Sequence, residues 1–181
     1  MSRQRVPPPP LDTHPDPEHA ANWRPDPSRT PQEWLVEGLL EEDHDAPYRL
    51  VRVYGQPFAP RELPLNYELG PLRCCYANAF ALASEHSDLR YVEGYCTTWG
   101  SDTWKNRHGW CIDEDDQVVD PTWGTGRLPL AYRGIVLPLD IAEPHAKPFS
   151  HGTIDGGMMT DIPTLARLLG FPWPPTPEHS R

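Results

Sequence analysis

The acidic run at residues 113–116, Asp-Glu-Asp-Asp, limits how this chain can fold more than any other feature. It separates two short stretches of β-forming residues, which predicts a β-hairpin. A three-residue loop at 113–115 would place His108 directly opposite Asp120. Because opposed residues share one face of a sheet, this register brings an imidazole and a carboxylate together. A loop of two or four residues would instead place them on opposite faces.

A second pattern predicts a helix that begins with a thiol. Gly70 and Pro71 interrupt any element that precedes it. Apolar residues then recur at the i, i+3, i+4 and i+7 spacing of one helix face: Tyr76, Ala79, Phe80 and Ala83. We therefore expect Cys75 in the first turn, where free backbone N–H groups and the helix dipole favour a thiolate. The same N–H groups could stabilise a developing oxyanion.

Together these residues resemble the transglutaminase-like and papain-like cysteine enzyme superfamily. Its pattern is a Cys and an aromatic at a helix N-terminus, a His on a strand, and an Asp-Pro-Thr on the next strand. The matching segments, within about residues 70–124, are Cys75-Tyr76, His108-Gly109-Trp110 and Asp120-Pro121-Thr122. The resemblance implies an α+β fold with the nucleophile at the N-terminus of a helix packed on an antiparallel sheet. It also implies that Cys75 is the nucleophile, His108 the general base and acid, and Asp120 the orienting group.

The chain departs from that pattern at the second oxyanion donor. Papain-like enzymes usually carry a Gln a few residues before the nucleophile, and the stretch from Asn66 to Arg73 has none. Asn66, Tyr67 or a Trp indole N–H are the candidate substitutes.

Each of these residues taken alone also has a structural interpretation. Free Cys is among the most buried residue types, and Cys74, which matches no position of the family pattern, fits that description better than Cys75. An isolated His or Asp is usually a hydrogen-bonded core imidazole or a turn residue. The ordered set of three is what favours catalysis.

Zinc is a rival use of the same atoms, because it prefers thiolate and imidazole ligands. The candidate ligands are Cys75, Cys96, His108 and Cys111. Structural zinc sites usually show paired ligands at short spacing, such as Cys-x2-Cys, and this chain has no such pair. We therefore expect neither a metal nor another cofactor. Cys96 and Cys111, on adjacent predicted strands, are expected to lie near enough to pair if oxidised.

Aromatic residues cluster around the proposed site. We expect some of them to wall a substrate pocket, since pockets tend to be apolar with a few placed polar groups. The candidate substrate-binding residues are Tyr76, Trp99, Trp104, Trp110 and Trp123. A core position is the favoured alternative for Trp110. The polar loop at 100–104 is the candidate mobile wall.

The remaining sequence predicts one α+β domain at 30–181 after a Pro-rich, polar arm at 1–29 that we expect to be disordered. Thr30 and Glu33 form a capping box, with Pro at the first helical position, before a helix at 31–42. Further expected elements are strands at 48–55, 90–97, 108–113, 116–120 and 131–137, a long loop at 57–71, and a final short helix at 164–169.

Charge and hydropathy exclude two classes of partner. The net charge of −10 argues against nucleic acid, and Lys105 with Arg107 is too small a basic patch to bind phosphates. No apolar run approaches the length of a membrane span, and the first ten residues lack the apolar region of a secretory signal. We expect a soluble cytoplasmic protein whose four Cys residues are reduced.

The leading functional hypothesis is a cysteine hydrolase that attacks an amide or ester carbonyl and forms a thioester. Its substrate would be a peptide, a protein or a small amide. An acyltransferase of the transglutaminase type would use the same three residues. A third hypothesis is a catalytically silent protein-binding module of the same fold, with the Pro-rich arm as its docking contact and Trp23 as an anchor.

Overall fold

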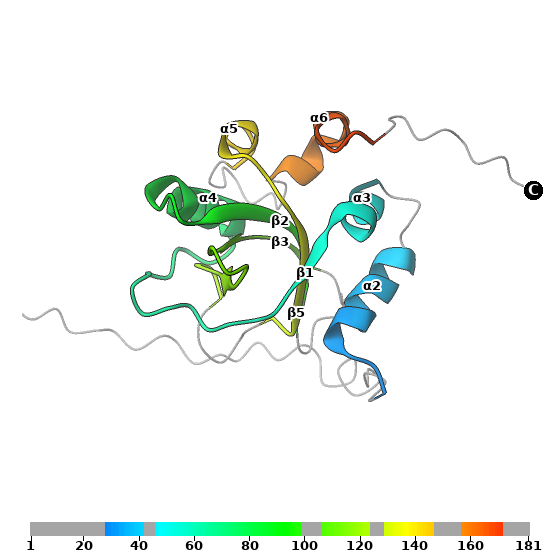
Figure 1. The fold of residues 1–181 in the computed structure, drawn as a ribbon, viewed down its shortest axis with the longest axis horizontal. Helices are drawn as coiled ribbons and strands as arrows, with labels where there is room; N and C mark the ends of the chain where they lie inside the picture. Colours follow the sequence, from blue (N-terminus) through cyan, green and yellow to red (C-terminus); the bar gives the residue numbers. More distant parts are fainter. Residues whose placement is uncertain (1–27, 42–45, 99–105, 124–128, 147–156, 172–181) are drawn as a thin grey trace, which may run out of the picture.

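A five-stranded antiparallel sheet with a curled shape forms the centre of the fold (Figure 1). The computed structural model describes residues 28–41, 46–98, 106–123, 129–146 and 157–171. The strands are β1 (Gln56–Phe58), β2 (Arg90–Thr97), β3 (Asn106–Ile112), β4 (Val118–Val119) and β5 (Ala131–Val136). Their order in the sheet is β1-β5-β2-β3-β4, so β5 lies beside β2 and away from the strand that precedes it in the chain.

Helices pack against one face of this sheet, and α4 lies alongside β2 and β3 (Figure 1). The helices are α2 (Pro31–Glu41), α3 (Ala46–Tyr54), α4 (Cys75–Glu85), α5 (Leu139–Ala142) and α6 (Ile162–Leu168), with a 3-10 helix, η1, at Met158–Thr160. The capping box of α2 is confirmed: the Thr30 N–H donates to the Glu33 carboxylate over 2.6 Å, and the Glu33 N–H donates to the Thr30 hydroxyl over 3.3 Å. No helix within the described residues is long and apolar enough to cross a membrane.

Side chains alternate between the two faces of the sheet along each strand. Each face carries a cluster of buried residues. One face packs with the helices, through Leu35, Leu39, Ala79, Ala83, Tyr91, Tyr95, Cys111 and Ile135. The other face forms a smaller cluster of Phe58, Val92, Cys96, Trp110, Ile112, Val118 and Tyr132. His108 belongs to this second face, since it lies two residues before Trp110 on β3.

The expected strand at 48–55 is wrong, since this segment forms most of α3. Its apolar residues fit a helix better than a strand. Pro47, Leu50 and Val51 are the buried residues of α3, and their spacing of three and four residues defines one helix face. The short strand β1 follows at the start of the expected loop.

The predicted hairpin forms, but with a register two residues from the expected one. Ile112 pairs with Val118, so five residues form the loop, and the Asp113 N–H donates to the Gln117 carbonyl over 3.0 Å. A five-residue loop keeps the same parity as a three-residue loop. His108 and Asp120 therefore stay on one face, as diagonal and not direct neighbours.

The two cysteines expected to be near each other are far apart. Cys96 pairs with Asn106 across β2 and β3, whereas Cys111 pairs with Tyr91, five residues further along. Five residues of strand span about 16 Å, which a disulfide cannot bridge. The two side chains also belong to clusters on different faces of the sheet.

The other predicted elements agree with the structure to within a few residues at their ends. The exceptions are the strand expected at 116–120, of which only Val118–Val119 is paired, and α5 and η1, which were not expected. The expected arm at 1–29 lies outside the described residues except for Ser28 and Arg29, and the expected mobile wall at 100–104 lies wholly outside them.

Candidate active site at the start of helix α4

Cys75 is the first residue of α4 and is partly exposed. Gly109 of β3 allows the start of this helix to approach the strand closely. A Cβ atom at Gly109 would lie 2.9 Å from Cδ1 and 3.1 Å from Cα of Tyr76, and 3.4 Å from the Cys75 carbonyl oxygen. Any larger residue at position 109 would therefore push the thiol away from β3.

His108 and Asp120 form a buried pair beside this helix terminus. His108 Nε2 lies 2.7 Å from Asp120 Oδ2, and only 3% of His108 and 1% of Asp120 is exposed. Because Asp120 occupies Nε2, the ring nitrogen left for the thiol is Nδ1.

Further donors fix the Asp120 carboxylate. The Tyr132 hydroxyl donates to Oδ2 over 2.8 Å, and the backbone N–H groups of Thr122 and Trp123 donate to Oδ1 over 2.9 and 3.4 Å. Burial is the largest influence on this carboxyl and acts to raise its pKa. The His108 charge and hydrogen bond, with these donors, outweigh it and lower the pKa of Asp120 below its ordinary value.

His108 also interacts with Cys75. Burial is again the largest influence and acts to raise the pKa of the thiol. The hydrogen bond and charge of His108, and the backbone N–H groups of Gly109 and Tyr76, outweigh it, so the pKa of Cys75 is lowered. The thiolate is thus stabilised by an imidazolium and by two backbone donors.

The pKa of the His108 imidazole is shifted upward, opposite to that of the Cys75 thiol. Burial alone would lower its pKa, but the Asp120 charge and hydrogen bond, together with Cys75, raise the pKa of His108 to about 10. A lowered thiol pKa beside a raised imidazole pKa favours a thiolate–imidazolium pair at neutral pH.

The buried cysteines have a different character. Burial raises the pKa of Cys96 and of Cys111. The Cys111 thiol donates to the Ala79 carbonyl over 3.1 Å, on the core side of α4. Cys74 is partly exposed, like Cys75. Of these four thiols, Cys75 is the one whose hydrogen-bonding partners include an imidazole.

Asn78, one turn into α4, connects two loops of the site through hydrogen bonds. This role was not predicted from the sequence. Its side-chain amide donates to the Pro71 carbonyl over 2.8 Å and to the Thr122 hydroxyl over 3.0 Å. A Cβ atom at Gly70 would lie 2.5 Å from Asn78 Oδ1, so the glycine makes room for this amide. The loop that precedes Cys75 and the loop that follows Asp120 are therefore held by one side chain.

Tyr132 was also missed. It lies on β5, across β2 from His108, and its hydroxyl reaches Asp120 because the sheet is curled. The sequence signal available was its parity: Tyr132 opposes Cys96 and so shares a face with His108. That signal could be used only once β5 was known to pair with β2.

The aromatic residues expected to bind substrate differ in position and burial. Trp110 is fully buried, stacks on His108 with ring centroids 6.0 Å apart, and so supports the imidazole from the core. Trp123 is partly exposed and meets His108 edge-on at 6.0 Å. Tyr76 is only 5% exposed. Trp99 and Trp104 lie outside the described residues.

The structure does not bring Tyr67 to the thiol. Its ring packs against His86, just past the last residue of α4, with centroids 5.1 Å apart. An eleven-residue helix spans about 16 Å, so Tyr67 lies at the far end of α4 from Cys75. Asn66, its neighbour, is exposed. The Trp110 and Trp123 indole N–H groups are buried and have no hydrogen-bond partner among the described residues, so both remain candidate donors.

Within the described ranges, no three His, Cys, Asp or Glu side chains form a group that could hold a metal ion. No protein-family model, no curated protein and no solved structure matches this chain.

Proposed function

We propose that this protein is a cysteine-dependent hydrolase that acts on an amide or ester carbonyl. Cys75 is the nucleophile, His108 the general base and acid, and Asp120 the group that orients the imidazole. The observation that carries the proposal is the position of His108, which bonds Asp120 through Nε2 and interacts with Cys75. We further propose that the fold is of the papain and transglutaminase type, with its nucleophile at the start of a helix packed on an antiparallel sheet.

In the first half of the reaction, Cys75 Sγ attacks the carbonyl carbon and forms a tetrahedral oxyanion. The His108 imidazolium then gives its proton to the leaving nitrogen or oxygen, whose bond to carbon breaks, and a thioester remains. The backbone N–H groups at the start of α4 lie close to the developing charge, which favours this step.

In the second half, neutral His108 takes a proton from water, and the hydroxide attacks the thioester. The C–S bond breaks, a carboxylic acid is released, and the thiolate–imidazolium pair is restored. An amine in place of water would give acyl transfer through the same steps. Hydrolysis is the proposal because it needs no second substrate.

Alkylation with iodoacetamide tests the nucleophile without a known substrate. We expect Cys75 to be labelled at pH 7 at least tenfold faster than a free cysteine derivative, since its thiolate fraction is larger. Cys75→Ala should abolish the fast phase. Mass spectrometry of the labelled peptide would identify the modified residue.

Cys74→Ala is the matched control, because it removes a thiol of similar exposure one residue away. It should leave most of the fast labelling. Equal losses in both variants, with circular dichroism unchanged, would disprove the choice of nucleophile. Fast labelling without turnover of any peptide, amide or ester in a substrate panel would instead favour a silent binding module.

A further inference from the structure

Strand β3 places a cation close to the candidate nucleophile. Arg107 precedes His108 and lies on the same face of β3 as Gly109, the residue against which Cys75 and Tyr76 pack. Two residues of strand separate these positions by roughly 7 Å. Arg107 is partly exposed.

Tyrosines surround this guanidinium. Tyr95 lies directly opposite Arg107 on β2, and its hydroxyl interacts with the guanidinium. Tyr48 of α3 stacks on Tyr95, with ring centroids 4.7 Å apart and 22° between the planes. Among the described residues, no carboxylate forms an ion pair with Arg107. Within the described part of the chain, Arg107 is thus a partly buried cation without an ion-pair partner, in a protein of net charge −10.

Tyr76 adds a second, independent observation. Its side chain is 5% exposed, and its hydroxyl is buried with no hydrogen-bond partner among the described residues. This hydroxyl interacts electrostatically with the buried Glu93 carboxylate, and also with Cys75 and Arg107. Glu93 is already bonded by the Tyr91 hydroxyl and by the Met158 and Met159 N–H groups. Buried polar groups normally have hydrogen-bond partners, and an acceptor carried by a ligand would provide one for this hydroxyl.

We infer that Arg107 and Tyr76 form a subsite for a carboxylate carried by the acyl substrate close to its scissile carbonyl. The inference rests on the proposed function, because it names a substrate class for the Cys75 site. A guanidinium offers planar paired donors that match a carboxylate, and a phenolic hydroxyl supplies one more. Substrates with an acidic side chain or a terminal carboxylate beside the scissile bond fit this arrangement. Amides that lack such a group would leave the Tyr76 hydroxyl without an acceptor among the described residues.

Two alkylating reagents of similar size test the subsite. Iodoacetate carries a carboxylate and iodoacetamide a neutral amide, so the ratio of their second-order rates at Cys75 measures preference for the anion. We expect Arg107→Gln to lower this ratio by about tenfold, the size of effect typical of one charged hydrogen bond. Arg107→Lys should lower it less, since it keeps the charge but not the paired donors. Tyr76→Phe should lower it while leaving the net charge unchanged.

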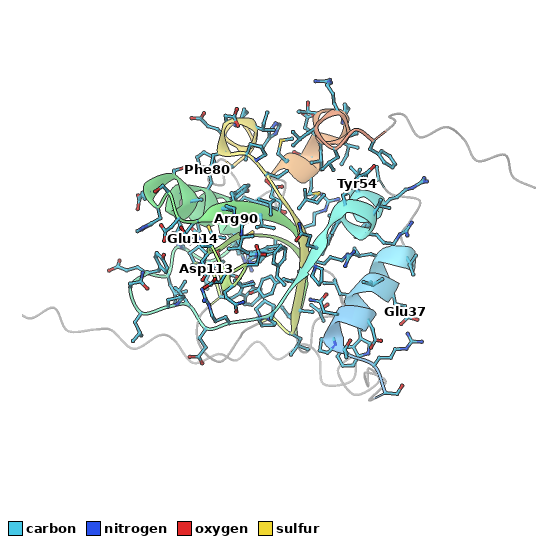
Figure 2. All side chains as sticks on the ribbon, viewed as in Figure 1. Glu37, Tyr54, Phe80, Arg90, Asp113 and Glu114 are labelled. Atoms are coloured by element: carbon cyan, nitrogen blue, oxygen red, sulfur yellow. The ribbon has the colours of Figure 1, made fainter. Side chains whose placement is uncertain are left out.

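Arg90→Gln is the matched control. It removes the same charge from an exposed position five residues along the sheet from Arg107, beside Asp113 (Figure 2). The ratio should not change in this variant. An unchanged ratio in Arg107→Gln and Arg107→Lys with circular dichroism unchanged, or an equal fall in Arg90→Gln, would overturn the inference.

Failure of the proposed function would look different. A slow iodoacetamide rate in the wild-type protein would disprove activation of Cys75, whereas the rate ratio would still report whether an anion is preferred. A ratio in the wild type no greater than that of a free cysteine derivative would overturn the subsite even if the iodoacetamide rate were fast.

Discussion

Asp120 is the most constrained side chain of the site, because a buried carboxylate accepts four hydrogen bonds here. Two come from His108 and Tyr132, and two come from the backbone after Pro121. Such a group holds the imidazole in one tautomer and one orientation. A substitution at Asp120 can therefore test its role separately from that of Cys75.

We predict that Asp120→Asn lowers turnover by a large factor while the fold persists. In the Ser-His-Asp triads of serine proteases, the wrong imidazole tautomer lowers the rate by a factor on the order of 10⁴. The loss here should be smaller, since the thiolate–imidazolium pair partly maintains itself. Measurement of kcat on any substrate found, with circular dichroism as the folding check, tests this. A fully active variant would mean that Asp120 is only a turn residue.

Tyr132→Phe is a milder probe of the same carboxylate. It removes one donor to Asp120 Oδ2 and leaves the aromatic ring in its cluster. We predict a smaller fall in turnover than in Asp120→Asn, because the His108 contact remains. A larger fall would show that the tyrosine hydroxyl, and not the carboxylate, is the more important group.

The pH dependence of labelling gives a third test at this scale. The pKa of Cys75 is lowered from its ordinary value of 9.0, so the labelling rate should rise to its plateau with a midpoint below pH 9. His108→Gln removes the hydrogen bond and charge that lower this pKa, and burial then dominates. The midpoint should therefore move to higher pH. An unchanged midpoint in this variant would show that the imidazole does not activate the thiol.

At the scale of elements, the site depends on how α4 is attached to two loops. Asn78 bonds the loop before the helix and the loop after β4, and the Gly70 N–H donates to the Pro121 carbonyl over 2.7 Å. These contacts join segments that are some fifty residues apart in the chain. The geometry between thiol and imidazole is thus set by loops as well as by the sheet.

We predict that Asn78→Ala destabilises the protein by about 1–2 kcal/mol, since one exposed and one partly buried hydrogen bond are lost. A fall of roughly 2–8 °C in melting temperature corresponds to that change. Labelling of Cys75 should also slow. Ser84→Ala, which removes one local bond to the Phe80 carbonyl on the same helix, should change both quantities little. Equal effects of the two substitutions would show that Asn78 only supports the helix.

Local patterns predicted most elements, and they failed where two periods fit one segment. Residues 48–55 are rich in Val and Tyr, which favour strands, but Leu50 and Val51 are adjacent and share a helix face with Pro47. The odd-numbered loop length predicted that His108 and Asp120 share a face of the sheet. The acidic run did not show whether the loop has three or five residues, and this length sets the register. The alternation of side chains predicts which face of a sheet a residue occupies. It does not predict which residue lies opposite on the neighbouring strand.

For the whole molecule, the order of the strands explains the residues that were missed. Since β5 inserts beside β2, Tyr132 reaches a carboxylate that follows β4, with β2 and β3 between the two strands. Gln32 of α2 donates to the Phe58 and Tyr132 carbonyls over 3.1 and 2.8 Å, which attaches α2 to β1 and β5. Neither contact follows from local sequence, because each depends on a pairing between distant segments.

The last prediction concerns residues 1–27, at the end of the chain where Pro and polar residues dominate. They contain too little apolar surface to offset a backbone ordering cost of about 1–2 kcal/mol per residue. Deleting them, while keeping the contact of Arg29 with Glu37 and the Thr30 cap, should shift the melting temperature by less than about 2 °C. If the arm docks a protein substrate, the deletion and Trp23→Ala should both weaken processing of that substrate while iodoacetamide labelling stays constant. A large loss of stability would instead show that the arm belongs to the folded domain, and the boundary predicted at residue 30 would be wrong.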